Sequence, residues 1–379
     1  ELNTMDFDFS EDQLSLRDAV ARWVEKGFGF ERRHQLAKAG GATRAVYGEL
    51  AELGLTGLAV PEALGGMGFG AVEAMVVMEE LGRGLVNAPY AHGALVAPAL
   101  LAAAPDAVQQ AWLPKVADAS ALVVLAHQER AARYRLNHVT TRATQGAGGW
   151  TVSGAKSVVP AGDEADAFIV PARVAGADAD EAGIGLFLVE KAAAQVRGYP
   201  THDGARAAEV VLKDAPATLI TADGLAVLET AVDIGIAAQC AEAVGLMDKL
   251  TAITVEYMNT RKQFGVAIAS FQALRHRIAD VKMQLELGRS MSYFATLTLG
   301  RERAQRRRAV SQARVQLGQS MRFVGQQCVQ LHGGIGVTDE YVGSHYFKRL
   351  TMLEMNFGDT MHHLGEVSAR MQDTAGVFA

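Results

Sequence analysis

Apolar positions recur at helical spacing through the first part of the chain, up to about residue 118. Ser10, followed three residues later by Gln13, has the signature of a capping box and predicts the start of the first helix. Leu14, Val20 and Trp23 continue this helix at near-helical spacing. Further helices are predicted at about 42–53, 71–81 and 93–103, with a glycine-rich loop at 60–68.

The pattern changes near residue 120. Short stretches of apolar or β-branched residues now alternate with turn residues, which is typical of a small β-barrel or sandwich. Strands are predicted at about 121–126, 149–156, 167–170, 184–189 and 209–212. The segment 175–182, rich in small residues and Asp, is predicted to be an exposed loop.

From residue 223 the helical pattern returns in long runs. Helices are predicted at about 224–260, 271–300, 306–331, 341–353 and 360–374. Long helices with few interruptions favour an antiparallel bundle, and such bundles often bury further apolar faces between subunits. The sequence therefore predicts an α+β protein with an N-terminal helical domain (1–118), a β-domain (119–221) and a C-terminal helical bundle (222–379).

Composition narrows the possible functions. The net charge of −6 argues against a nucleic-acid scaffold. The one basic run, 301–308, is interpreted as a solvated helix end or turn, with a phosphate- or CoA-facing role as the alternative. Cys240 and Cys328 lie in apolar helical runs and are expected to be buried thiols in a reducing compartment. No membrane span or signal peptide is predicted, so a cytoplasmic protein is expected.

Two stretches carry candidate chemistry. The segment 326–336 ends a helix at Gly333-Gly334, where glycine can take a positive φ and leaves bare backbone that a flat or anionic ligand could approach. A plain helix C-cap explains the same pair. The second stretch is Arg261-Lys262-Gln263-Phe264-Gly265, followed by Phe271-Gln272.

Together these stretches resemble the acyl-CoA dehydrogenase family, which has an Arg-x-x-Phe-Gly segment followed by Gln and a later Gln-x-x-Gly-Gly. The resemblance implies the acyl-CoA dehydrogenase fold, with a helical domain, a β-barrel or sandwich and a four-helix bundle. It also implies a tetramer with FAD as cofactor, an acyl-CoA as substrate and an electron-transferring flavoprotein as partner.

The resemblance also assigns cofactor-binding residues. Arg261 would pair with the FAD diphosphate, whose oxygens suit the guanidinium fork; a surface arginine at a helix end is the alternative. The other positions implied to bind FAD are Gln263 and Phe264 beside Arg261, Phe271 and Gln272 on the adenosine side, Gln330, Gly333 and Gly334 from the adjoining subunit, and Gln128 at the flavin-facing position of the β-domain.

The β-domain departs from the family pattern. Where members have Thr-Glu-Pro-Gly-x-Gly-Ser-Asp, this chain continues from Gln128-Glu129 without the glycines and the serine. Lys156 is present, but the hydroxyl residue that follows it in the family is replaced by an apolar or proline position near Pro160. The half of the flavin site that the β-domain would form therefore differs in sequence from the family pattern.

The position of the catalytic base differs as well. Most members carry a Glu in Tyr-Glu-Gly-Thr to remove the proton α to the thioester, and this chain has Phe357 or Gly358 there. Asp359 is the candidate base, with an N-cap of the next helix as the alternative. Members with the base on the first bundle helix would have it at Gly235. His362 and His363 are about 100° apart on a helix, so no metal site is predicted.

The combination of His127-Gln128-Glu129-Arg130 with Phe357-Gly358-Asp359 resembles one branch of the family. That branch includes the small subunit of pimeloyl-CoA dehydrogenase and the paired subunits of steroid side-chain dehydrogenases, in which a second chain supplies the base. The favoured interpretation is FAD-dependent α,β-dehydrogenation of an acyl-CoA, either through Asp359 or with a partner's Glu. A non-catalytic scaffold or regulatory subunit is the second interpretation, and a different flavin chemistry on the same fold is the third.

Overall fold

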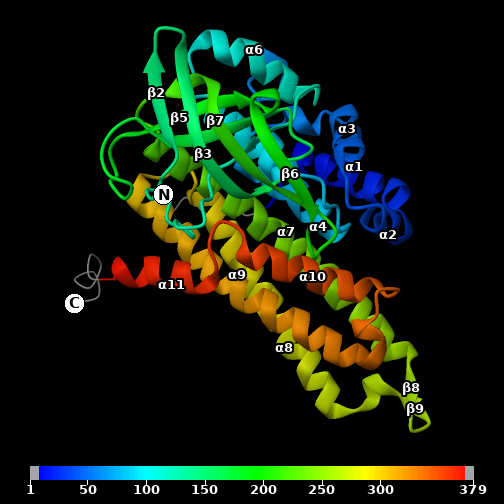
Figure 1. Ribbon diagram of the computed structural model, residues 1–379. Helices are drawn as coiled ribbons and strands as arrows, with labels where there is room; N and C mark the ends of the chain where they lie inside the picture. Colours follow the sequence, from blue (N-terminus) through cyan, green and yellow to red (C-terminus); the bar gives the residue numbers. More distant parts are fainter. Residues whose placement is uncertain (1–7, 372–379) are drawn as a thin grey trace, which may run out of the picture.

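Helices, a sheet and again helices follow one another in the computed structural model, which describes residues 8–371 (Figure 1). The N-terminal helices are α1 (Glu11–Gly27), α2 (Phe30–Lys38), α3 (Arg44–Glu52), α4 (Ala71–Arg83), α5 (Ala97–Leu101) and α6 (Asp106–Ala117). Short helices of other types are η1 (Leu55–Gly57), η2 (Glu62–Leu64) and the π-helical η3 (Ala91–Val96).

The N-terminal predictions are confirmed in their main features. The Ser10 side chain accepts from the Gln13 backbone N–H, and the Gln13 side chain accepts from the Ser10 backbone, so the capping box is present. The sequence analysis missed α2 and α6. In α2 the buried residues are Arg33 and His34, so a helix that buries polar side chains has no apolar stripe to reveal it.

The middle region is a closed barrel. Its strands are β1 (Val123–Leu125), β2 (Arg142–Gly146), β3 (Gly149–Pro160), β4 (Ala167–Arg173), β5 (Ile184–Glu190), β6 (Ala194–Pro200) and β7 (Arg206–Thr221). Neighbouring strands pair in the order β4-β2-β3-β7-β5, and β5 pairs again with β4, which closes the ring. The sequence predicted a β-barrel or a β-sandwich, and the strand pairing shows a barrel. The predicted loop at 175–182 connects β4 and β5.

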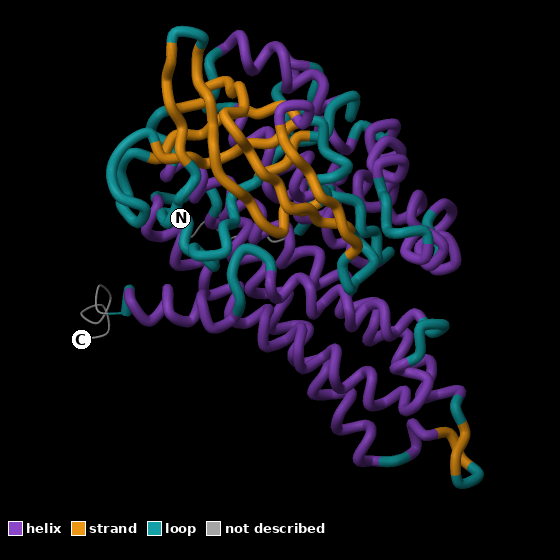
Figure 2. Tube along the Cα trace, in the orientation of Figure 1, coloured by secondary structure: helices purple, strands orange, loops and turns teal. Residues whose placement is uncertain are grey.

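The C-terminal helices form the bundle. They are α7 (Leu225–Thr260), α8 (Gln272–Thr298), α9 (Arg303–His332), α10 (Val342–Met355) and α11 (Thr360–Ala369), with η5 (Ile268–Ser270) and η6 (Gly333–Val337) at the turns. Residues 372–374, at the end of the last predicted helix, lie outside the described residues. A small hairpin, β8 (Lys262–Gln263) with β9 (Val266–Ala267), lies at the end of the bundle remote from the barrel (Figure 2).

Helix α7 is the centre of the molecule. It packs against α4 on one side and against α8, α9 and α10 on others, so it is apolar almost all round. By length and composition α7 could cross a membrane, but 89% of its most apolar window is buried inside the protein. Cys240 on α7 and Cys328 on α9 are both buried and free, as the sequence analysis expected.

The basic run 301–308 includes the start of helix α9 and is exposed over residues 301–305, as predicted, but its last three residues are buried or half-buried. Arg306 and Arg307 bind Asp233 of α7 with N–O distances of 2.8 Å, and Arg303 binds Glu229 of α7 at 2.6 Å. Arg306 is buried in this arrangement. The run therefore holds the start of α9 against α7, a contact that residue spacing along the chain does not reveal.

Candidate functional site

Most of the residues assigned to FAD lie at one end of the bundle. Arg261 follows the last residue of α7, and Phe264 lies at the tip of the β8–β9 hairpin. Leu331 of α9 packs against Met258 of α7 and Ile268 of η5. This cluster brings the start of α8 and the end of α9 to the same end of the bundle. Phe271 and Gln272 lie at the start of α8, and Gln330, Gly333 and Gly334 lie at the end of α9.

This end of the bundle is open to an incoming ligand. Phe264 is 92% exposed with a φ of 53°, and its ring meets Phe271 edge to face, with the ring centroids 6.0 Å apart. An aromatic side chain with so little cover is typical of a binding surface. Arg261 is exposed and has no ion-pair partner among the residues that the structure describes. A cation beside uncovered aromatic rings fits the diphosphate and the adenine of FAD.

The glycine pair fits the same ligand. Gly333 ends α9 with a φ of 64°, as the sequence predicted for a helix C-terminus. A Cβ placed on Gly333 or Gly334 would meet no atom within 4 Å in its own chain. The space above this backbone is free for a ligand or a second subunit, and Gln330 is exposed beside it.

Gln128 lies in a different part of the molecule. It follows β1, and its backbone oxygen accepts from the Ser157 N–H at 2.8 Å. Gln128 lines a small cavity between the barrel, α7 and α11, whereas the Arg261 hairpin projects from the far end of the bundle (Figure 1). One chain therefore does not bring the two groups of assigned FAD residues together. The sequence analysis assigned only Gln330, Gly333 and Gly334 to an adjoining subunit, but within one chain they lie at the same end of the bundle as Arg261.

Lys156 is part of the barrel interior. Its ammonium group donates to Glu129 at 2.7 Å and to the Pro171 carbonyl at 2.8 Å. The Lys156 side chain is 0% exposed and that of Glu129 is 3% exposed. Burial alone would raise the pKa of Glu129, but the Lys156 charge and hydrogen bonds from Lys156, Thr140 and Thr141 lower it to about 2. This pair stabilises the barrel wall beside Gln128.

An aromatic cluster occupies the place where the sequence analysis looked for a base. The Phe357 ring lies between the rings of His127 and His92. It stacks on His127 with the ring centroids 5.7 Å apart, and its centroid lies 5.4 Å from that of His92. The same ring lies against α7, where a Cβ on Gly235 would come within 2.8 Å of it. Burial lowers the pKa of His92 to about 3 and that of His127 to about 4, so both imidazoles are neutral. We call these three rings the aromatic plug.

The carboxylates around the plug already have partners. Asp359 is the N-cap of α11, and its side chain accepts from the His362 N–H at 2.8 Å. Asp233 binds Arg306 and Arg307, and Glu354 accepts from the Thr360 hydroxyl at 2.7 Å. This geometry favours the N-cap alternative for Asp359.

We expect substitutions of Asp359 to separate capping from catalysis. Asparagine is an N-cap as good as aspartate, whereas alanine lowers stability by about 1 kcal/mol. Asp359→Asn should therefore leave both unfolding and the rate of flavin reduction in the assembled enzyme close to those of the parent, and Asp359→Ala should lower only stability. Loss of a general base lowers the rate by about 10²–10⁴-fold. Such a loss in Asp359→Asn would make Asp359 the base.

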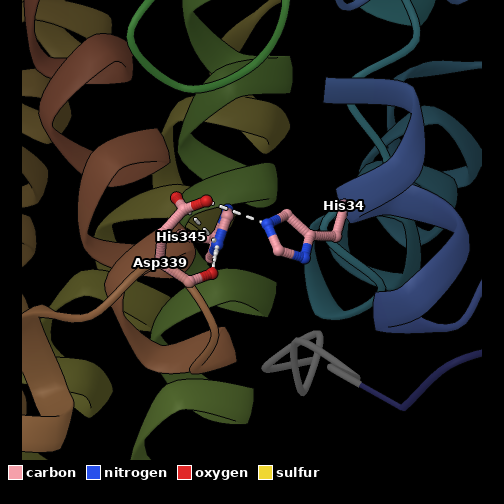
Figure 3. Close-up of side chains that lie close together, drawn as sticks. All are labelled: His34, Asp339 and His345. Carbon is pink, nitrogen blue, oxygen red and sulfur yellow. Dashed lines mark hydrogen bonds and ion pairs between the residues drawn. The ribbon is translucent and has the colours of Figure 1, made fainter. Parts of the chain in front are cut away.

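The structure also gathers His34, Asp339 and His345, whose ligand atoms lie within 4.8 Å of one another (Figure 3). His34 Nε2 donates to the Asp339 carboxylate at 2.9 Å. Arg33 donates to His345 Nδ1 at 2.5 Å, so His345 Nε2 carries the proton and donates to the Asp339 carbonyl at 2.7 Å. A protonated nitrogen offers a metal no lone pair, and the geometry favours a hydrogen-bonded cluster that joins α2 to α10.

A helical domain, a closed barrel and a helical bundle are the arrangement expected of the acyl-CoA dehydrogenase fold. Family models agree: the acyl-CoA dehydrogenase N-terminal domain matches residues 10–120, and the C-terminal domain matches residues 222–372.

Individual relatives support the same assignment. Acyl-CoA dehydrogenase IpdE2 of Mycobacterium tuberculosis is 30% identical over 342 residues, covering 89% of this chain and 91% of that protein. Acyl-CoA dehydrogenase FadE12 of the same organism is 28% identical over 351 residues, covering 88% of each. A chain of the ChsE4–ChsE5 complex, also from Mycobacterium tuberculosis, superposes with a TM-score of 0.86 at 26% identity, covering 98% of this chain and 100% of that chain. The chain belongs to the acyl-CoA dehydrogenase family, whose members are FAD-binding oxidoreductases of fatty acid and lipid metabolism.

Proposed function

We propose that this chain is one subunit of a heteromeric FAD-dependent acyl-CoA dehydrogenase whose partner chain supplies the catalytic carboxylate. The observation that carries the proposal is the aromatic plug: Phe357 fills the space between His92, His127 and Gly235. A phenyl ring cannot take a proton, and the half-buried Phe357 occupies the space next to Gly235 where a base on α7 would stand. The ChsE4–ChsE5 structure is itself a complex of two named chains, which supports a heteromeric arrangement.

In this proposal the chain contributes cofactor contacts to a neighbouring barrel. Arg261 would hold the FAD diphosphate, whose oxygens suit a guanidinium, and Phe264 and Phe271 would pack against the adenosine. The bare backbone of Gly333 and Gly334 allows close approach, with Gln330 and the neighbouring Gln263 and Gln272 as hydrogen-bonding groups. Bound FAD supplies a hydride acceptor for the β-carbon of the thioester. The expected assembly is a cytoplasmic tetramer that passes electrons to an electron-transferring flavoprotein.

A scaffold or regulatory subunit that takes part in no flavin site is the second candidate. The plug is compatible with it. The uncovered Arg261, Phe264 and glycine pair favour the first candidate, because a scaffold has no need of an exposed aromatic ring beside an unpaired guanidinium.

Anaerobic titration with acyl-CoAs tests the proposal. We expect the chain purified alone to show no flavin absorbance that a thioester bleaches. Co-purified with a family member that carries Glu in Tyr-Glu-Gly-Thr, it should form a flavin-containing complex that bleaches. Bleaching of the chain alone would overturn the proposal in favour of a self-sufficient enzyme. Bleaching of the partner at the same rate and flavin content without this chain would favour the scaffold.

A further inference from the structure

A second cavity, of about 270 Å³, lies between α1, α2, α4, α7 and α10, away from the aromatic plug. Most of its wall is apolar, with Val24 and Phe28 of α1 and its C-cap, Phe30 of α2, Leu85 after α4, and Ile253 of α7. The volume is slightly below that of typical pockets for drug-sized ligands, so a short ligand is the natural fit.

One cation in this wall is buried without an anion. Arg33 lines the cavity, is 3% exposed and has no ion-pair partner among the described residues. Its guanidinium donates to His345 Nδ1 and to the Asp203 carbonyl, both at 2.5 Å, while its Nε is a buried donor with no acceptor. The partners of Arg33 are thus a neutral ring and a backbone oxygen.

The Arg33 side chain remains charged in this setting. Burial lowers the pKa of Arg33 to about 10, although the charges of Asp203 and Asp339 act to raise it, and the guanidinium stays protonated at neutral pH. A buried charge without a counter-ion destabilises a protein unless hydrogen bonds or a bound anion compensate it. His345 cannot provide the anion, since its second nitrogen donates to Asp339 (Figure 3).

The other charged residues that line the cavity form no ion pair with Arg33. Glu80 and Arg83 pair with each other at 3.3 Å, and Arg83 also binds Asp248. Lys249 is exposed at the cavity and, in the part of the chain that the structure describes, has no ion-pair partner. Glu25 also lines the cavity and is exposed, so solvent and salt screen its repulsion. Asp203 and Asp339 act on Arg33 through their charges, but neither carboxylate forms an ion pair with it, and Lys249 adds an exposed cation to the same cavity.

We propose that this cavity binds a small carboxylic acid with an aliphatic body. The carboxylate accepts from the Arg33 Nε–H, which has no acceptor in the structure, and the exposed Lys249 adds electrostatic attraction. The apolar wall takes the aliphatic body. The wall of this cavity includes no residue of the Arg261 hairpin or of the plug, so the proposal does not depend on the proposed dehydrogenase function.

Calorimetric titration of the full chain with hexanoate, hexanamide and inorganic phosphate tests this site. Hydrogen bonds to charged groups contribute about 1.5–3 kcal/mol, so hexanoate should bind about 10–100-fold more tightly than the neutral hexanamide. Phosphate should bind more weakly than hexanoate because it leaves the apolar wall uncovered. Equal affinity for the acid and the amide, or tighter binding of phosphate, would overturn the proposal.

Two variants and a control locate the binding. Arg33→Met removes the cation, and Ala21→Phe fills the cavity from α1 while Arg33 stays in place. Each should weaken hexanoate binding at least tenfold, and the second variant keeps the test valid if the first does not fold. Arg22→Gln removes a neighbouring exposed charge that does not line the cavity and should leave binding unchanged. Unchanged affinity in Ala21→Phe, or an equal loss in Arg22→Gln, would exclude this cavity as the site.

Discussion

Replacing Arg349 with methionine should lower the free energy of unfolding by about 3–5 kcal/mol, because it leaves two buried carboxylates without their cation. Arg349 of α10 binds Glu242 of α7 at 2.6 and 3.0 Å and Asp203 of the β6–β7 turn at 2.7 Å. The side chains of Arg349, Asp203 and Glu242 are 12%, 1% and 5% exposed. Asn87, between α4 and η3, also donates to the Asp203 carbonyl at 2.6 Å, so the cluster joins all three regions of the fold.

The effect of Arg349→Met should depend on pH. Burial raises the pKa of Asp203, but Arg349 and the hydrogen bonds it receives outweigh burial and hold the pKa below 3.8. A carboxylate with a lowered folded-state pKa contributes stability above its unfolded pKa and loses it as the pH falls through the folded value. In the variant only the hydrogen bonds from Thr201 and Ala205 oppose burial, so the pKa of Asp203 is higher than in the parent and protonation relieves the buried charge. The difference in stability should therefore be largest near pH 7 and shrink toward pH 4.

Urea unfolding at pH 7.5 and 4.5 measures this effect. Arg322→Met is the matched control, because Arg322 is 66% exposed and lies 3.9 Å from Glu354. An exposed pair of this kind contributes about 0–1 kcal/mol. A loss in Arg349→Met no larger than that in the control would show that the cluster does not hold the three regions together.

Replacing Arg261 with glutamine should weaken FAD binding by about 10–100-fold, the equivalent of a lost charge-assisted contact of about 1.5–3 kcal/mol. The expectation rests on the proposed contact between Arg261 and the diphosphate. Since Arg261 is exposed and unpaired in the described chain, its removal should leave the free energy of unfolding unchanged. Flavin content and a titration of flavin fluorescence, both on the assembled complex, measure the change.

Lys262→Gln provides the control for charge, because Lys262 is the next residue and is also exposed. If both variants lose the same affinity, the hairpin attracts the cofactor only through its net charge. If neither loses affinity, the cofactor does not contact Arg261. A loss confined to Arg261→Gln supports the proposed contact with the diphosphate, since a lysine is not equivalent to a guanidinium at such a site.

The sequence predicted those elements whose signal is local. Long apolar runs predicted α7, α8 and α9, and the start of α1 followed from its capping box. Strands β2 and β6 were missed because few of their side chains are buried, so neither shows an apolar pattern. The N-terminal π-helical turn at η3 was merged with α5, since one apolar stretch crosses both.

The same limit applies to the candidate site, where only residues in local motifs could be proposed from the sequence. Arg261, Phe264 and the glycine pair stand in short motifs, so the sequence alone was enough to propose them as cofactor-binding residues. The position of Phe357 could not be predicted, because its ring meets His92 from the N-terminal helices, His127 from the barrel and Gly235 from α7. No spacing along the chain relates these four residues.

The sequence by itself determined the order of helical, β and helical regions, the family, and the residues that mark its cofactor motifs. The tertiary structure alone decided that β4 closes the barrel, that Phe357 forms the plug, and that Arg33 is buried without an anion. Periodicity and capping depend on neighbours a few residues away, and the sequence displays them directly. Contacts between distant polar or single aromatic residues follow no period, so only the folded chain reveals them.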